Sequence, residues 1–150
     1  GAAVNPFVPP FEQRALRLLK KQKAGASFFQ SQYCFDIERL KTFLDRLIEL
    51  TKGSPPPLLV GAGPLRSARF ARWLRENTPG VAVPNHIIEK IEKYPRKEQQ
   101  KAGLETCIEI VETVKTLTGV AGIHLMTYNW ESSVSEIIEA TGLSKTVRNV

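Results

Sequence analysis

The chain has 150 residues, of which 42% are hydrophobic and 24% are charged, and its formal net charge at pH 7 is +6. This length fits one domain with a single core, and no apolar run approaches the ~20 residues of a membrane-spanning helix, so a cytoplasmic protein without membrane contact is expected. The positive charge favours anionic partners in general, but the basic residues are spread over several helices, and a nucleic-acid partner is not predicted.

Four short apolar runs recur along the chain, and a helical pattern follows each of them. This alternation is typical of βα units whose strands pair in parallel. The first helix is predicted over 11–25, where Gly25 would end it. The second would be capped by Asp36 and would end at a proline-rich segment. The strands are predicted at residues 1–5, 27–32, 57–63 and 120–128.

More than one helix is predicted between the third and fourth strands. The first of them follows the third strand directly, and a short helix over 85–94 and a long one over 97–117 come after it. An extra helix therefore precedes the fourth strand. The last helix is predicted to end at Gly142, which leaves a loosely held tail after Leu143. The inner face of the helix after the third strand is predicted to consist of Leu65, Phe70, Trp73 and Leu74.

Two architectures fit this series of units. It could form a small doubly wound sheet, or it could be half of an eight-unit barrel, whose typical length of ~250 residues exceeds this chain. The chain opens with Gly1, and its one methionine is Met126. We therefore expect residues 1–150 to be a single domain of four βα units that is a fragment or processed piece of something longer.

Uncharged polar side chains gather at the predicted strand ends, where parallel α/β folds bind their ligands. Amides and bare backbone suit a flat heterocycle with several donors and acceptors. Gln30 and Gln32 could instead bond neighbouring strand ends, and of the two Gln32 has the stronger claim to a ligand. The strand ends carry Asn5, Gln30, Gln32, Gly61, Ala62, Gly63, Tyr128 and Asn129.

The chain lacks a catalytic set of its own. It has no P-loop, nucleophile elbow or paired strand-end carboxylates, and Cys34, Cys107 and two histidines are too few and too scattered to predict a disulfide or a metal site. His124 lies mid-strand and is predicted to be a buried, hydrogen-bonded support residue. Lys20 and Lys21 could neutralise a phosphate or simply keep the first helix soluble.

Four stretches of the chain have the order and spacing of a known family. They are "GAAVNP", "KKQKAGASFFQSQYCFD", "LLVGAGPLRSARFARWLRENTPGVAVP" and "GVAGIHLMTYN". They resemble the methylenetetrahydrofolate reductase family, flavoenzymes that reduce methylenetetrahydrofolate to methyltetrahydrofolate. The resemblance implies an α/β fold in which parallel (βα) units form the second half of a (βα)8 TIM barrel. The missing N-terminal half of the barrel would then be a partner of this chain.

The resemblance also implies an activity. The chain would belong to a cytoplasmic oxidoreductase of one-carbon metabolism and methionine biosynthesis, with FAD lying across the strand ends. NADH or NADPH would give hydride to FAD and leave, and the reduced flavin would pass hydride to the bound folate. The protein's share would be to bind and orient these molecules.

For substrate binding, the resemblance implies roles for three residues. By motif match, Gln32 corresponds to a glutamine that contacts the folate pterin, and Tyr128 falls where a residue packs near the flavin and the nicotinamide. Bacterial members often carry a substrate-stacking aromatic residue where this chain has Ala68. Either Phe70 substitutes for that ring, or the stacking is lost.

For cofactor binding, the resemblance implies a second set. Lys21 corresponds to a lysine that helps hold FAD, and Asn5 stands where other members place a flavin-adjacent tyrosine. His124 is assigned to the same site as a support residue. The family's catalytic acid would lie upstream of Gly1, so no catalytic residue is assigned here and the isolated chain is expected to be inactive.

Two other hypotheses remain open from the sequence. A free-standing α/β module that binds a small ligand or a partner protein, without catalysis of its own, would form a cooperative monomer. By contrast, the half barrel that the resemblance implies would expose two sheet edges, and such edges could pair to form homo-oligomers. An anion or nucleic-acid binder, which rests on the net charge alone, would bind its partner more weakly as salt is added.

Overall fold

The four predicted strands form one parallel sheet in the order β1-β2-β3-β4. The structure is a computed structural model that describes residues 1–143, so the predicted tail lies outside the described residues. A doubly wound sheet reverses its strand order at a switch point, whereas a barrel keeps sequential order. The α/β fold is therefore consistent with a partial barrel. The strands are β1 (Ala2–Val4), β2 (Phe29–Tyr33), β3 (Leu58–Ala62) and β4 (Val120–Leu125).

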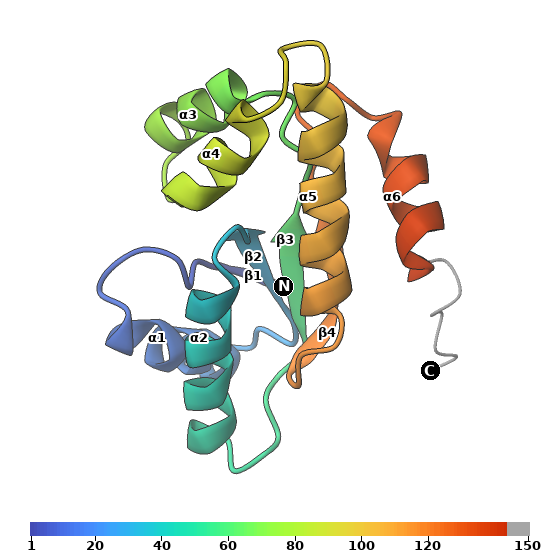
Figure 1. Cartoon of the computed structure of the whole chain (residues 1–150). Coiled ribbons are helices and arrows are strands. Elements are labelled where there is room, and N and C mark those ends of the chain that lie inside the picture. Colours follow the sequence, from blue (N-terminus) through green and yellow to red (C-terminus); the bar gives the residue numbers. More distant parts are fainter. Residues whose placement is uncertain (144–150) are drawn as a thin grey trace.

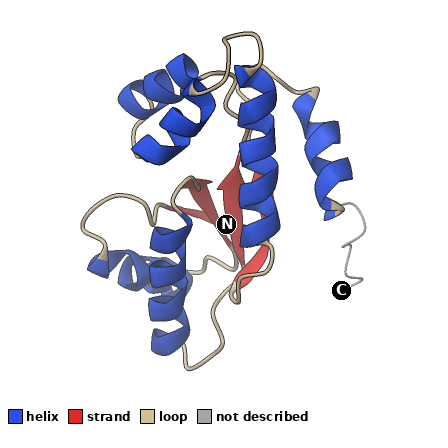
Figure 2. Ribbon diagram, viewed as in Figure 1, coloured by secondary structure: helices blue, strands red, loops and turns tan. Residues whose placement is uncertain are grey.

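Helices alternate with the strands, and three of them lie between β3 and β4 as the sequence predicts. Figure 1 shows α5 running alongside the sheet with α6 beside it, while α3 and α4 lie beyond the strand ends. Figure 2 shows the strands gathered at the centre of the molecule. No helix of residues 1–143 is long and apolar enough to cross a membrane. The helices are α1 (Glu12–Lys23), α2 (Ile37–Leu50), α3 (Ala68–Asn77), α4 (Asn85–Glu92), α5 (Gln99–Val114) and α6 (Ser133–Thr141).

Local signals in the sequence set where several helices begin and end. The Asp36 carboxylate accepts a hydrogen bond from the Arg39 N–H at 2.9 Å, which confirms the predicted N-cap of α2. At the other end of the chain, Gly142 closes α6 with φ 64°, a left-handed conformation that glycine adopts without strain. One face of α2 is buried, through Leu40, Phe43, Leu44 and Leu47.

The predicted inner face of α3 is wrong in part. Leu74 is buried, but Trp73 is 41% exposed and Phe70 is only partly buried. The face that enters the core instead carries Ala68, Ala71 and Leu74. Two alanines on that face leave little volume to fill, so the helix packs close to its neighbours, with Trp73 turned outward and Phe70 at the edge of the core.

The two faces of β2 differ as the alternation of the sequence predicts. Phe29 and Ser31 are buried, whereas Gln30 and Gln32 are partly exposed on the opposite face. Pairing with β3 shifts register between Gln30 and Tyr33. At this irregularity the Ser31 hydroxyl accepts a hydrogen bond from the N–H of Gly61 at 2.9 Å, so the buried polar group is satisfied.

Candidate functional site

The ends of β1 and β2 lie close together, and one turn of the chain touches both. Asn5, which follows β1, donates a hydrogen bond from Nδ2 to the Gly80 carbonyl at 2.8 Å. Gln32, near the end of β2, directs Nε2 at the Pro79 carbonyl, 3.5 Å away. Two amides that the sequence analysis placed at strand ends are therefore neighbours at one edge of the sheet.

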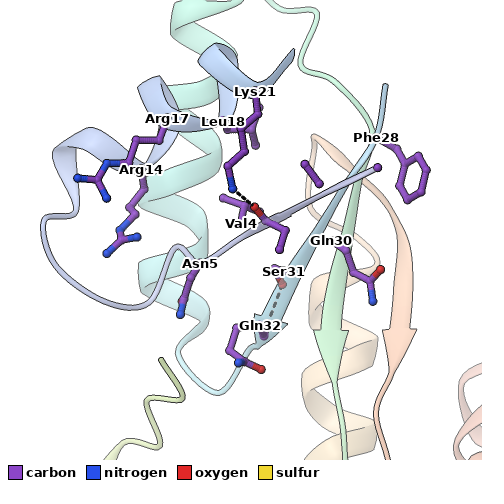
Figure 3. Close-up of a pocket in the computed structure, with 13 residues that line it drawn as sticks. Val4, Asn5, Arg14, Arg17, Leu18, Lys21, Phe28, Gln30, Ser31 and Gln32 are labelled. Atoms are coloured by element: carbon purple, nitrogen blue, oxygen red, sulfur yellow. Dashed lines mark hydrogen bonds between the residues drawn. The ribbon is translucent and has the colours of Figure 1, made fainter. Parts of the chain in front are cut away.

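A hollow of about 810 Å³ lies along the open side of β1 (Figure 3). Its walls come from β1, α1 and β2, and they bring together Asn5, Lys21 and Gln32. Gln30 lines the same hollow farther from the strand ends. Half of the six predicted site residues thus share one cavity, which reaches the edge of the sheet where the two amides meet.

Three cationic side chains of α1 line this hollow. Arg14, Arg17 and Lys21 are spaced by three and four residues, which places them on one face of the helix. The Lys21 ammonium donates to the Ala3 carbonyl at 2.5 Å, and Arg14 Nε donates to the Val8 carbonyl at 2.9 Å. The lining residues that the structure describes include no carboxylate. The hollow is therefore electropositive and suits an anion.

The amide of Gln32 is only partly used by the protein itself. Its Oε1 accepts a hydrogen bond from the Tyr33 N–H at 3.0 Å, and its Nε2 makes the long contact with the Pro79 carbonyl. A primary amide has two donor hydrogens and two acceptor lone pairs. Gln32 therefore keeps both kinds of capacity for a ligand whose edge carries donors and acceptors.

Ala68 does not lie where it could contact a substrate. Its side chain is 2% exposed, and its N–H donates to Gln99 Oε1 on α5 at 3.1 Å. The methyl group faces the core because α3 turns its small residues inward. Phe70, the possible substitute for that ring, is partly buried, and it packs against the core as well as against the Trp73 ring.

Phe70, Trp73 and Tyr128 form an aromatic cluster on the surface. Trp73 stacks on Phe70 with 5.9 Å between ring centroids and 16° between planes, and Tyr128 lies 5.7 Å from Phe70 and 5.4 Å from Trp73. The Arg66 guanidinium lies over the Phe70 ring at 4.9 Å. Tyr128 is 47% exposed and Trp73 is 41% exposed, so part of the cluster is open to solvent. In the sequence, Phe70 and Trp73 stand three residues apart, which places them on one face of a helix, but nothing there links them to Tyr128.

The glycines at the end of β3 have a packing role. A Cβ on Gly61 would lie 2.5 Å from Met126 Cε, and one on Gly63 would lie 2.0 Å from the Met126 carbonyl oxygen. The space that was expected to admit a ligand ring is thus taken by the chain after β4. His124, which pairs with Gly61, is partly exposed rather than buried as predicted. It shares the less covered face of the sheet, because its neighbours Ile123 and Leu125 pack into the core.

The two cysteines, Cys34 and Cys107, are buried and are not candidate nucleophiles. Burial raises the pKa of the Cys34 thiol to about 12, and burial likewise raises the pKa of the Cys107 thiol to about 12. Both thiols therefore stay protonated and unreactive near neutral pH. Within residues 1–143 there is no group of three or more histidine, cysteine or acidic side chains that could hold a metal ion.

Comparison with known proteins identifies similar chains. The family model described as methylenetetrahydrofolate reductase matches residues 3–142. A protein of Caenorhabditis elegans named a probable methylenetetrahydrofolate reductase (NADPH) is 29% identical over 143 residues, which cover 94% of this chain and 21% of that protein. This chain therefore spans about a fifth of that relative's length.

A solved structure has a similar fold. It is an uncharacterized protein from Clostridium thermocellum described as binding two copies of 5-methyl-5,6,7,8-tetrahydrofolic acid. The TM-score is 0.61 and the sequence identity 14%, over 91% of this chain and 49% of that one. At this identity the likeness concerns the fold, and it extends over about half of the solved chain.

Proposed function

Because the chain belongs to the methylenetetrahydrofolate reductase family, we propose that it forms part of the folate and FAD site of a flavin-dependent oxidoreductase. The reaction is the reduction of methylenetetrahydrofolate to methyltetrahydrofolate with NADH or NADPH. One observation carries the proposal: Asn5 after β1, Lys21 of α1 and Gln32 of β2 line a single hollow, which runs along the open side of β1 and reaches the strand ends. Bound FAD supplies the hydride chemistry, and the residues of this chain bind and orient.

The donor set of the hollow fits a phosphate-bearing cofactor such as FAD. Arg14, Arg17 and Lys21 put three positive charges on one wall, and phosphate oxygens are strong acceptors for such groups. Lys21 at present covers the carbonyl of Ala3 on the open edge of β1. A further strand that paired with β1, as in a complete barrel, would replace Lys21 there and fill the part of the hollow along β1. The part at the strand ends and the Lys21 ammonium group would then be left for the cofactor.

The substrate fits two features of the strand ends. The Gln32 amide offers a donor and an acceptor without adding charge, which suits the edge of a pterin ring. The aromatic cluster offers an open ring face for the remainder of a folate, and ring pairs prefer such offset or tilted packing. In this proposal Phe70 takes the stacking role that the family pattern gives to position 68, while Tyr128 lies beside it.

We place this chain as the second half of a (βα)8 barrel, with the other half supplied by residues outside 1–150. The described lining of the hollow holds no carboxylate that could act as a general acid. That observation also supports the alternative function, a module that binds a folate-like ligand without catalysis. The two differ in hydride transfer, which only the first allows.

A ligand titration tests the proposal. The full-length protein is expected to bind 5-methyltetrahydrofolate, measured by calorimetry, and to become yellow and retain FAD after gel filtration. Oxidation of NADH or NADPH followed by transfer to the folate would identify the enzyme. Folate binding without FAD retention would favour the alternative function, a module that binds folate without catalysis. If neither molecule binds, both proposed functions are wrong.

Lys21→Ala is expected to lower FAD affinity about tenfold, because it removes one charge-assisted contact to phosphate. Lys20→Ala is the matched control, since Lys20 is the adjacent lysine of α1 and lines a different hollow. FAD affinity is measured by fluorescence titration at low and high salt, and the gap between the variants should narrow as salt screens the charge. Equal losses of FAD affinity in both variants would show that FAD responds to the overall charge of α1 and not to a specific contact with Lys21.

A further inference from the structure

The turn between α3 and α4 crosses the ends of two strands. Its base is anchored in the core, because Val81 is 6% exposed and Val83 is 3% exposed. Its tip is the pair Pro79 and Gly80, whose carbonyls face the amides of Asn5 and Gln32. We call residues 78–84 the crossing turn. Both amides contact this turn, Asn5 through the Gly80 carbonyl and Gln32 through the Pro79 carbonyl.

The two contacts of the crossing turn are unequal. The Asn5 bond to the Gly80 carbonyl is 2.8 Å, near the usual length of such bonds, whereas the Gln32 contact with the Pro79 carbonyl is 3.5 Å and therefore weak. Asn5 is also held from its own side, since its Oδ1 accepts a bond from the Phe7 N–H at 3.1 Å. Both ends of the Asn5 amide are thus engaged within the protein.

Resting on the proposed function, we propose that Asn5 is a positioning residue that holds the crossing turn over the strand ends. In this role Asn5 acts through the turn that it holds. Gln32 exchanges its weak contact with Pro79 for the ligand, while the firm Asn5 bond keeps the turn in place as a wall of the site. These different roles for Asn5 and Gln32 follow from the two distances, because a ligand displaces the weaker hydrogen bond more readily.

The position of the crossing turn also affects where the aromatic cluster lies. The crossing turn continues α3, and α3 carries Phe70 and Trp73 of the aromatic cluster against Tyr128. The helix is therefore tied to the strand ends at two places, by its rings near β4 and by the turn near β1. A turn released from Asn5 would also loosen the ring face that we assign to the substrate.

Asn5→Asp tests the proposal with a minimal change. The substitution keeps an acceptor for the Phe7 N–H, removes the donor to Gly80 and faces that carbonyl with a carboxylate. The amide of Val81, which bonds the Thr78 carbonyl at 3.1 Å, is expected to exchange its hydrogen about threefold to tenfold faster. Affinity for 5-methyltetrahydrofolate in the full-length protein should fall about fivefold.

Gly80→Ala disturbs the same hydrogen bond, from Asn5 to the Gly80 carbonyl, without adding charge. A Cβ on Gly80 would lie 2.3 Å from Asn5 Nδ2, so Gly80→Ala should give the same loss of folate affinity and the same faster exchange. Gly53→Ala is the matched control. Gly53 has a similar backbone, with φ 86° against 80° for Gly80, but no atom lies within 4 Å of its added Cβ. It should leave folate affinity unchanged.

The readouts separate this proposal from its rivals. Unchanged exchange of Val81 in Asn5→Asp would show that Asn5 does not hold the turn. Faster exchange with unchanged folate affinity, or loss of FAD in the charge-free Gly80→Ala, would equally overturn the positioning role. If the unaltered protein binds neither folate nor FAD, the proposed function fails, and the exchange measurement still decides whether Asn5 holds the turn.

Discussion

Gly103→Ala is expected to lower the free energy of unfolding by about 3 kcal/mol, because the added methyl group overpacks a backbone contact. A Cβ on Gly103 would lie 1.6 Å from the Leu65 carbonyl oxygen, so α5 would have to move away from the segment that leads into α3. In an exposed helix the same change stabilises by about 1 kcal/mol. A loss of stability would therefore indicate the close contact with Leu65, and a gain would indicate an exposed position.

The experiment compares urea unfolding midpoints of the full-length protein and two variants. Lys101→Ala is the control, since Lys101 lies on the same helix with a side chain that is 80% exposed and a 4.0 Å ion pair to Glu105. Exposed ion pairs of this kind contribute little to stability, so the unfolding midpoint of Lys101→Ala should barely change. A midpoint for Gly103→Ala at or above that of the unaltered protein would contradict the close approach of α5 to Leu65.

This contact also bears on the site. The segment at Leu65 begins the approach to α3, and α5 holds it a second time where Gln99 accepts the Ala68 N–H. Through α3, the long helix thus fixes where the aromatic cluster and the crossing turn lie. We expect substitutions at Gly103 to reduce folate binding as well as stability, although Gly103 contacts neither proposed ligand site.

Regular elements were predictable from the sequence because their signals are local. The alternation of apolar runs with helical patterns predicted the four strands, and their parallel pairing followed from the helices between them. The cap at Asp36 and the stop at Gly142 were each confirmed for the same reason. These features depend on residues a few positions apart, which a single sequence displays.

The errors arose where contacts join distant parts of the chain. Periodicity shows that Phe70, Trp73 and Leu74 repeat at helical spacing, but it does not show which face meets the core. The structure puts Ala68 inside, leaves Trp73 41% exposed and buries Phe70 only in part. Likewise, nothing in the sequence links Asn5 to Gly80, 75 residues away. Strand-end positions could be predicted, and the turn that crosses them could not.

Gln32→Glu is expected to weaken folate turnover about 10-fold to 100-fold, because it removes a donor at the pterin edge and adds a negative charge in its place. The fold should persist, since a carboxylate oxygen can still accept the Tyr33 N–H that Oε1 accepts now. Oxidation of NADH or NADPH should change much less. That half-reaction involves the flavin and the nicotinamide, whereas the amide of Gln32 is assigned to the folate.

Gln30→Glu supplies the matched control for this prediction. Gln30 and Gln32 share one face of β2 and line the same hollow, so both variants bring the same charge into an electropositive space. Only Gln32 lies beside the crossing turn. Stopped-flow measurement of each half-reaction should therefore find the loss confined to the folate step of Gln32→Glu. Equal losses in both steps, or in both variants, would mean that charge in the hollow is what matters and that Gln32 does not recognise the pterin.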